Sequence, residues 1–361
     1  MTARPGSERL TIALDAMGGD KAPAMVIAGA EIARKRHPDL RFLIFGDEAR
    51  ILPLLKRRKK LAALVEIRHC TEVVTNDMRP SVALRTGRAT SMRLALDAVA
   101  SGEAACAVSA GNTGALMAMA KFVLKTLPNI DRPAIASFFP TLRGESAMLD
   151  LGANVDCDPE NLVQFAIMGS VFAKAVLNLE RPSVGVLNIG AEALKGNETV
   201  KEAAARLRGI ELPGTFHGFV EGNDVPAGTV DVVVTDGFTG NVALKIAEGT
   251  AKLYTEWLRR TFRSSIAARL GYLLARNAFA KLRKRADPRQ YNGAMFLGLR
   301  GICVKSHGGT DAKGFANAVD VAVDLVRHRF NDTVTREMER YARSAPQPPV
   351  TDLPPAGAAT A

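Results

Sequence analysis

Five apolar segments of this 361-residue chain end in short loops of Gly, Asn, Ser, Thr and Asp. The segments are LTIALDAMGGD (10–20), ACAVSAGNTG (105–114), VGVLNIGAEALKGN (184–197), VDVVVTDGFTGN (230–241) and ICVKSHGGTD (302–311). In parallel α/β sheets, loops at the carboxyl ends of strands present backbone N–H groups to anionic ligands. We therefore expect the five loops to share one edge of a parallel sheet and to form a large polar cleft for a phosphate-like group.

The rest of the chain alternates in the same way between apolar runs and helical patterns. Further strand-like runs occupy 41–47, 65–70 and 146–153, and helical patterns cover 24–36, 82–100, 114–126, 159–178, 198–208, 241–262 and 312–329. Asp158 and Pro159 fit the cap and first turn of the 159–178 helix. The alternation predicts an α/β fold with a mostly parallel sheet covered on both faces. We expect one catalytic domain, single or two-lobed, over 1–343, no internal repeat, and a disordered Pro- and Ala-rich tail over 344–361.

Composition and cysteine spacing exclude several classes of protein. No run of 18 or more uncharged apolar residues occurs, so no transmembrane helix is predicted. Residues 1–9 lack the apolar core of a signal peptide, which favours a cytoplasmic protein. The four cysteines are far apart, without CxxC or a nearby His pair, so neither a zinc site nor a disulfide framework is predicted. Cys106 and Cys303 lie in apolar runs and are expected to pack in the core.

The first two polar loops contain five candidate ligand-binding residues. Gly18 and Gly19 either let the backbone approach a ligand closely or simply form a tight turn. Ser109, Asn112 and Thr113 stand at the start of the 114–126 helix, where hydroxyl, amide and N–H groups favour an anion. The alternative for Asn112 and Thr113 is ordinary helix capping.

The later loops add charged candidates. Lys195, between Asn188 and Asn197, is placed to meet a phosphate or a developing oxyanion, or is a solvated loop lysine. Lys305 and His307 follow the last apolar run, and His307 is a possible general acid or oxyanion donor.

Two acidic residues remain open between structural and catalytic roles. Asp236, which precedes Thr239 and Asn241, could act as a base or bind a donor. Asp150 lies within an apolar run and needs a partner if it is buried. The chain has no Gly-x-Ser-x-Gly elbow, His-Glu-x-x-His, Walker loop or GxGxxG fingerprint, so a hydrolase triad, a zincin, a P-loop ATPase and a dinucleotide site are not indicated.

Taken together, the motifs resemble the phosphate acyltransferase family, the acyl-acyl-carrier-protein:phosphate transacylases (PlsX) of bacterial phospholipid synthesis. The resemblance covers about residues 10 to 330 and rests on LDAMGGD (14–20), RPSVALR (79–85), VSAGNTGALM (108–117), LDLGANVDC (149–157), LVQFAIMGS (162–170), LNIG (187–190), KGN (195–197), DGFTGNVALK (236–245), QYNGAMFLGLRG (290–301) and VKSHG (304–308). It implies a Rossmann-like three-layer αβα sandwich and a homodimer. It also implies transfer of a fatty acyl group from acyl carrier protein to inorganic phosphate, with the acyl phosphate passing to a membrane glycerol-phosphate acyltransferase.

Phosphate is itself a nucleophile, so this reaction needs no covalent enzyme intermediate, and we expect no cofactor and no metal. On loop composition, Ser109, Asn112 and Thr113 would bind phosphate together with Lys195 and Lys305. Asp236, Thr239 and Asn241 would orient the phosphate or the pantetheine carbonyl, and His307 would assist the oxyanion or the leaving thiol. The main alternative is a phosphotransacylase that uses acyl-coenzyme A.

A basic segment over 251–289 carries eleven basic and two acidic residues, nine of the net charge of +11. Its pattern predicts a protruding amphipathic helical hairpin with a helix break at Gly271. Candidate contact residues are Trp257, Arg259, Arg260, Arg263, Leu273, Leu274 and Lys284. Three interpretations stay open: an anionic membrane surface, the acidic carrier protein, or a dimer interface with an arginine rim. Nucleic acid is not expected, because no recognition motif accompanies the charge.

Overall fold

A computed structural model describes residues 9–285 and 293–344. The predicted tail beyond Ser344 and the segment 286–292 lie outside the described residues. In sheet order, the strands are β3 (Val65–His69), β2 (Leu40–Gly46), β1 (Leu10–Asp15), β4 (Cys106–Ser109), β11 (Ile302–Lys305), β10 (Ala294–Leu297), β5 (Ala134–Thr141), β6 (Gly144–Leu149), β9 (Val232–Val234), β7 (Ser183–Leu187) and β8 (Thr215–Val220). The helices are α1 (Ala24–Arg36), α2 (Glu48–Lys56), α3 (Lys59–Ala62), α4 (Pro80–Thr86), α5 (Ser91–Ala100), α6 (Thr113–Leu124), α7 (Pro159–Leu177), α8 (Glu198–Gly209), α9 (Asp224–Ala227), α10 (Gly237–Arg263), α11 (Ile266–Leu274), α12 (Arg276–Arg285), α13 (Ala312–Arg327) and α14 (Phe330–Ser344).

The predicted α/β class and mostly parallel sheet are confirmed: one sheet of 11 strands carries helices on both faces. The helix predicted over 159–178 is α7, and it begins with a capping box between Asp158 and Asn161. The pattern predicted over 82–100 divides into α4 and α5, because α4 ends at Gly87 and Thr90 caps α5.

The strands of the two halves of the sheet run in opposite directions. β2, β1, β4 and β11 are parallel to one another, and so are β6, β9, β7 and β8. Between them, β10 is antiparallel to β11 and β5, and β5 is antiparallel to β6. The carboxyl ends of β1, β4 and β11 therefore point away from those of β6, β9 and β7. The expectation that all five polar loops share one edge of the sheet is wrong.

The two halves are related by an approximate twofold axis between β10 and β5. The order β2-β1-β4-β11-β10 on one side corresponds to β8-β7-β9-β6-β5 on the other. The ladders agree, because Leu14 pairs with Val108 in the first half as Val186 pairs with Val234 in the second.

The strand ends also agree between the halves. The N–H of Ala16 donates to the carbonyl of Phe45 at 2.9 Å, and the N–H of Asn188 donates to the carbonyl of Val220 at 2.8 Å. The β4–α6 junction reads VSAGNTG (108–114) and the β9–α10 junction reads VTDGFTG (234–240), which share a V-[S/T]-x-G-x-T-G pattern. The expectation of no internal repeat is therefore wrong.

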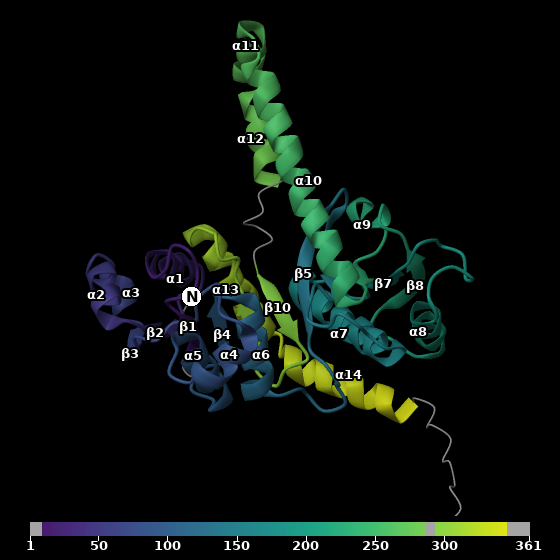
Figure 1. The fold of residues 1–361 in the computed structure, drawn as a ribbon, viewed down its shortest axis with the longest axis horizontal. Coiled ribbons are helices and arrows are strands. Elements are labelled where there is room, and N and C mark those ends of the chain that lie inside the picture. Colours follow the sequence, from purple (N-terminus) through teal and green to yellow (C-terminus); the bar gives the residue numbers. More distant parts are fainter. Residues whose placement is uncertain (1–8, 286–292, 345–361) are drawn as a thin grey trace, which may run out of the picture.

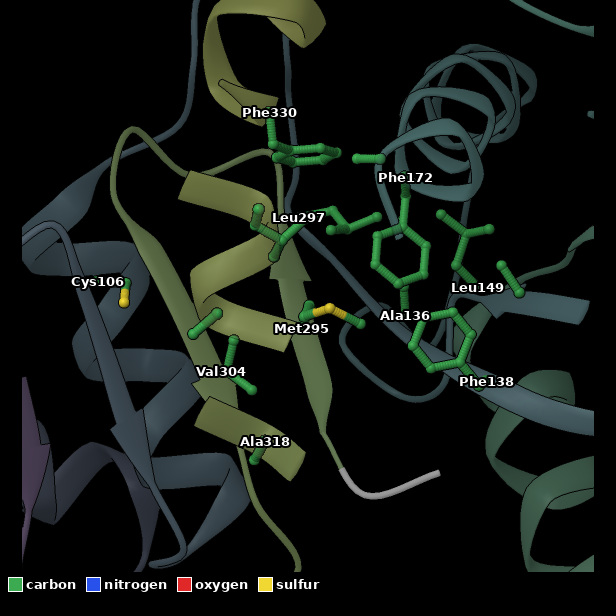
Figure 2. Close-up of a cluster of buried hydrophobic side chains, with 14 of the residues drawn as sticks. Cys106, Ala136, Phe138, Leu149, Phe172, Met295, Leu297, Val304, Ala318 and Phe330 are labelled. Carbon is green, nitrogen blue, oxygen red and sulfur yellow. The ribbon is translucent and has the colours of Figure 1, made fainter. Parts of the chain in front are cut away.

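Helices cover both faces of the sheet. One face packs on α1, α7, α8, α13 and α14, and the other on α4, α5, α6 and the start of α10. Figure 2 shows the first face where the two halves meet, with Met295 and Leu297 of β10 next to Phe172 of α7 and Phe330 of α14. Phe138 of β5 stacks on Phe172 with ring centroids 5.0 Å apart. This contact ties β5 to the helix layer at the centre of the sheet.

An arm of three helices leaves the body (Figure 1): α10 runs outward, α11 lies at its far end and α12 returns beside it. Rings of Phe262, Tyr272 and Phe279 join the three helices, with centroids 4.8–5.4 Å apart. The predicted helix break at Gly271 is wrong, because Gly271 lies inside α11 and the breaks fall at Ser264–Ser265 and Ala275.

One helix in the described ranges, α7, is long and apolar enough to cross a membrane, although no spanning segment is expected from the sequence. In the fold, 78% of its apolar window is buried among the sheet, α8 and α14. This burial is that of a core helix.

Candidate functional site

The polar loops form two groups. The first loop cluster comprises the loops after β1, β4 and β11 (15–20, 109–114 and 305–309), and the second loop cluster comprises the loops after β6, β9 and β7 (150–154, 235–241 and 187–197). The last residues of β11 and β6 lie within one residue of each other along the strand direction. Lys305 pairs with Ala294 of β10, and the next residue, Met295, pairs with Ala136 of β5, which in turn pairs with Leu149 of β6. Three strand spacings, about 14 Å, separate Lys305 from Leu149 across the sheet.

Asp15 is the centre of the first loop cluster. Its side chain is 1% exposed and accepts hydrogen bonds from the hydroxyls of Ser91 and Ser109, both at 2.6 Å, and from the N–H of Met17 at 3.2 Å. Burial raises the pKa of the Asp15 carboxyl, and the bonds from Ser109 and Ser91 oppose that rise. Asp15 thus connects β1, β4 and the first residue of α5.

Lys305 brings a buried positive charge to the same cluster. Its side chain is on the same face as Ser109, with which it pairs between β11 and β4, and it is 7% exposed. The ammonium donates to the carbonyl of Ser306, and no carboxylate of the described residues lies within ion-pair distance of it. Burial lowers the pKa of Lys305 to about 8, against the opposing carboxylates of Asp15 and Asp20. A buried ammonium without an ion-pair partner is costly, so this position favours an anionic ligand.

Gly18 lets the β1 and β4 loops touch. A Cβ on Gly18 would stand 2.5 Å from Asp15 Oδ2 and 2.6 Å from the N of Gly111. The Asp20 N–H donates to the carbonyl of Gly308 at 3.0 Å, which joins the β1 loop to the β11 loop. His307, in this last loop, is exposed and its Nδ1 accepts the N–H of Gly309 at 3.1 Å. That bond leaves Nε2 to carry the proton of the neutral ring.

The candidate residues at the start of α6 divide between structural and ligand roles. Asn112 caps α6 by accepting the N–H of Ala115 at 3.0 Å, and its amide donates to the carbonyls of Thr75, Asn76 and Met78. Ser109 is held by Asp15 and accepts the N–H of Gly111 at 3.1 Å. Thr113 is exposed in the first turn of α6. The side chains of Asn112 and Ser109 therefore shape the loop, and Thr113 faces solvent.

In the second loop cluster, Asp150 stands where Lys305 stands in the first. It is fully buried, and its carboxylate accepts the N–H groups of Ile135, Gly152, Ala153 and Asn154 and the amide of Asn154 at 2.7–3.2 Å. Burial raises its pKa, against these bonds. The contacts support the structural alternative for Asp150.

Among the remaining candidates of this cluster, Asp236, Asn188 and Asn197 bond to nearby backbone groups. Asp236 caps α10 and accepts the N–H and hydroxyl of Thr239 at 2.8 and 2.7 Å. Asn241 packs against Gly152, Asn197 caps α8, and Asn188 donates to the carbonyl of Lys195 at 3.0 Å. The side chain of Lys195 is exposed in the 187–197 loop. Five strand spacings, about 24 Å, separate the ends of β7 and β11, so the structure places Lys195 and Lys305 in different clusters.

Sequence reasoning missed Asp15 and Ser91 as site residues. Asp15 had a usable signal, because an acid at the end of an apolar run must find a partner once it is buried. Ser91 had none, since only the fold brings α5 to β1. Burial raises the pKa of the Cys106 and Cys303 thiols, as expected for packing residues. No group of three or more His, Cys, Asp or Glu among the described residues is arranged to hold a metal ion.

Solved structures share this fold. A phosphotransacetylase from Streptococcus pyogenes superposes with a TM-score of 0.61 over 88% of this chain and 94% of its own, at 18% identity. The EutD phosphotransacetylase from Staphylococcus aureus gives a TM-score of 0.58 over the same shares of the two chains, at 16% identity. At such identities the likeness shows the fold alone, an α/β fold similar to those of the two phosphotransacetylases.

The sequence comparisons are closer. The family model described as "Fatty acid synthesis protein" matches residues 10–333. The phosphate acyltransferase of Rhodospirillum centenum is 68% identical over 92% of this chain and 94% of its own, and that of Rhodospirillum rubrum is 61% identical over 92% and 96%. The chain therefore belongs to the phosphate acyltransferase family. It is an acyltransferase, and its reaction is a phosphate acyl transfer.

Proposed function

We propose that this enzyme transfers a fatty acyl group from acyl carrier protein to inorganic phosphate and releases an acyl phosphate. The first loop cluster would hold the phosphate. The observation that carries this assignment is the buried Lys305 ammonium, which has no ion-pair partner among the described residues and lies where three strand ends meet. The exposed first turn of α6 adds N–H groups and the positive end of a helix dipole nearby.

The chemistry follows from holding two reactants together. A phosphate oxygen attacks the thioester carbonyl carbon, a C–O bond forms, and the C–S bond breaks as the thiolate leaves and takes a proton. The enzyme has to orient the phosphate and stabilise the oxyanion, and it forms no covalent bond itself. Lys305 would bind the phosphate and His307 Nε2 would donate to the oxyanion or to the leaving sulfur.

The test is phosphate-dependent release of the carrier thiol. The purified chain, acyl-acyl carrier protein and phosphate are expected to give free thiol and an acyl phosphate that hydroxylamine traps in equal amount. Thiol release at the same rate without phosphate would overturn the proposal. The acyl-coenzyme A alternative is examined in a second arm with that donor, and a higher kcat/KM there would favour it.

In this proposal, the arm formed by α10, α11 and α12 contacts two partners, a second copy of the chain and the carrier protein. Along α10, the exposed Val242, Ile246, Leu253 and Trp257 recur on one helical face. We propose that this face pairs with a second copy of the chain. Arg259 and Arg260 both pair with Glu256, at 3.2 and 3.0 Å, so this trio keeps one net positive charge and Arg263 adds another. This positive surface would also receive the acidic carrier protein.

For the tip of the arm, we propose peripheral contact with anionic lipid, where a membrane glycerol-phosphate acyltransferase would receive the product. Leu273 and Leu274 of α11 are 56% and 88% exposed. Apolar side chains beside cationic ones bind such surfaces. Lys284, the remaining candidate contact residue of the arm, belongs to α12. The double variant Leu273→Glu, Leu274→Glu is expected to lose co-sedimentation with phosphatidylglycerol vesicles and to keep phosphate-dependent thiol release. Unchanged co-sedimentation would refute the lipid contact.

A further inference from the structure

The approximate twofold axis allows the two loop clusters to be compared position by position. Asp15 of the first cluster corresponds to Leu187 of the second, since each follows the residue that pairs with Val108 or Val234. By the same offset, Met17 corresponds to Ile189. The shared V-[S/T]-x-G-x-T-G pattern aligns Asn112 with Phe238.

The second cluster is apolar at these positions. Met17 is 8% exposed, whereas Ile189 is 80% exposed. Asn112 holds the 75–78 segment with its amide, whereas Phe238 is 63% exposed. Leu194 in the same group of loops is 89% exposed. The second cluster thus repeats the backbone plan of the first and presents large apolar side chains to its surroundings.

Partly buried apolar residues lie on the face of the sheet that both clusters share. One of them is Ala294, which pairs with Lys305. Phe139 of β5, Leu244 of α10 and Leu187 of β7 pack with Ala294 against the same apolar cluster and are only partly covered. Lys305 has its side chain on this face, because Cys303, two residues earlier, belongs to that cluster too. The ends of β6 and β7 lie three and five strand spacings from β11, about 14 and 24 Å, a span comparable to a long acyl chain and far beyond an acetyl group.

We propose that the second loop cluster binds the acyl chain of the thioester donor, which reaches it from Lys305 over Ala294, Phe139 and Leu244. The inference rests on the proposed function, because it takes the first loop cluster as the phosphate site. It assigns different substrates to the two clusters: the first loop cluster holds the phosphate acceptor, and the second loop cluster selects thioester donors with long acyl chains. Exposed Phe238, Ile189 and Leu194 form the distal end of this chain site.

The experiment compares palmitoyl and octanoyl donors on carrier protein in the thiol-release assay. The double variant Phe238→Ser, Leu194→Ser is expected to lower kcat/KM about tenfold for the palmitoyl donor, the equivalent of about 1.4 kcal/mol, and to change it little for the octanoyl donor. The KM for phosphate stays as in the unaltered enzyme. Leu142→Ser is the matched control, because Leu142 is 84% exposed in the turn between β5 and β6, outside both clusters, and it is expected to change neither donor.

Three results would overturn the inference. An equal loss with both donors would show that the loops do not sense chain length, and no loss with either would remove them from the donor site. A loss with both donors that accompanies dissociation of a dimer in size-exclusion chromatography would assign the apolar loops to an interface between copies. Failure of the proposed function is distinguishable, because the unaltered enzyme would then release no phosphate-dependent thiol from either donor.

Discussion

The first and second loop clusters share one backbone plan and differ in how their buried charged groups are satisfied. In the first, a buried acid and a buried ammonium lie at the ends of the two strands that flank β4, and Asp15 holds the hydroxyls of Ser91 and Ser109. In the second, Asp150 is bound by backbone N–H groups, and the loop tips carry exposed apolar side chains. The difference teaches that polar loop composition does not identify an anion site. The two clusters differ in how a buried charge is satisfied: the Asp150 carboxylate accepts four backbone N–H groups and one side-chain amide, whereas the Lys305 ammonium donates to the carbonyl of Ser306.

The largest expected effect is the difference between Lys305 and Lys195 in their contribution to kcat/KM for phosphate. Lys305→Met is expected to lower kcat/KM for phosphate about 100- to 1,000-fold, the range measured when one preorganised donor to a developing charge is removed. Lys195→Ala, in the second cluster, is expected to change it about twofold at most, as for an exposed substitution. Steady-state kinetics with phosphate as the varied substrate measures both. A larger loss for Lys195→Ala would move the phosphate site to the second cluster.

The next effect concerns two corresponding glycines. Gly18→Ala is expected to lower the free energy of unfolding by about 1–3 kcal/mol, because its Cβ would overlap Asp15 Oδ2 and the backbone N of Gly111. Gly190→Ala would meet only Glu192 Oε2 at 2.7 Å and Lys195 Cγ at 3.0 Å, which belong to exposed side chains that can move. It is expected to cost about 0.5 kcal/mol or less.

Urea unfolding of the two glycine variants measures this difference. Equal destabilisation would mean that the loops of the second cluster are as tightly packed as those of the first. Retention of full stability by Gly18→Ala would instead show that the β1 and β4 loops can separate at little cost.

The smallest effect is a displacement of the pH profile. In the proposed function it is protonated Lys305 that holds phosphate, so kcat/KM for phosphate is expected to fall as pH rises through the Lys305 pKa of about 8. The charges that face Lys305 are those of Asp15 on β1 and Asp20 in the β1 loop, and both raise its pKa. Removing the Asp15 charge therefore lowers that pKa further, and Asp15→Asn is expected to move the alkaline limb to lower pH.

Ser91→Ala is the control for this profile. It removes one hydrogen bond to Asp15 and keeps the carboxylate charge, so the alkaline limb is expected to stay within about a few tenths of a pH unit, because the Coulombic effect on Lys305 comes from the carboxylate and not from the uncharged hydroxyl. An unmoved limb in Asp15→Asn would show that Asp15 has only a structural role.

The sequence predicted the strands that carry the polar loops, because β1, β4, β7, β9 and β11 are dense apolar runs with glycine-rich ends. It did not reveal β5 and β10, and these two reverse the direction of the sheet. β5 contains Pro140, which is atypical of a central strand, so β5 does not stand out as a buried strand. A sheet without β5 and β10 would be parallel throughout, with all five loops at one edge. For this reason the sequence places Lys195 and Lys305 in one phosphate site, although the structure separates them.

The helix caps show a second limit of sequence reasoning. Asn112, Asp236 and Asn197 have the residue types of ligands and the residue types of caps, and the structure uses all three as caps. Local pattern could not separate the two uses, because the choice depends on which backbone N–H groups the fold leaves open. Asp15 and Lys305 differ from these three because their burial is set by neighbouring strands distant in the chain.

The insertion of β11 beside β4 has a consequence for synthesis. β4 pairs with β1 on one side and with β11 on the other, and β4 ends at Ser109 whereas β11 begins at Ile302. The ribosome must therefore add nearly two hundred residues before the second edge of β4 can be paired. An open strand edge invites pairing with other chains, and nascent chains stalled before β11 are therefore expected to be cut by protease within the first half and to bind holdase chaperones. Chains stalled well after Lys305 are expected to resist both. Equal resistance before and after that point would mean that the first half closes its sheet without help from the late strands.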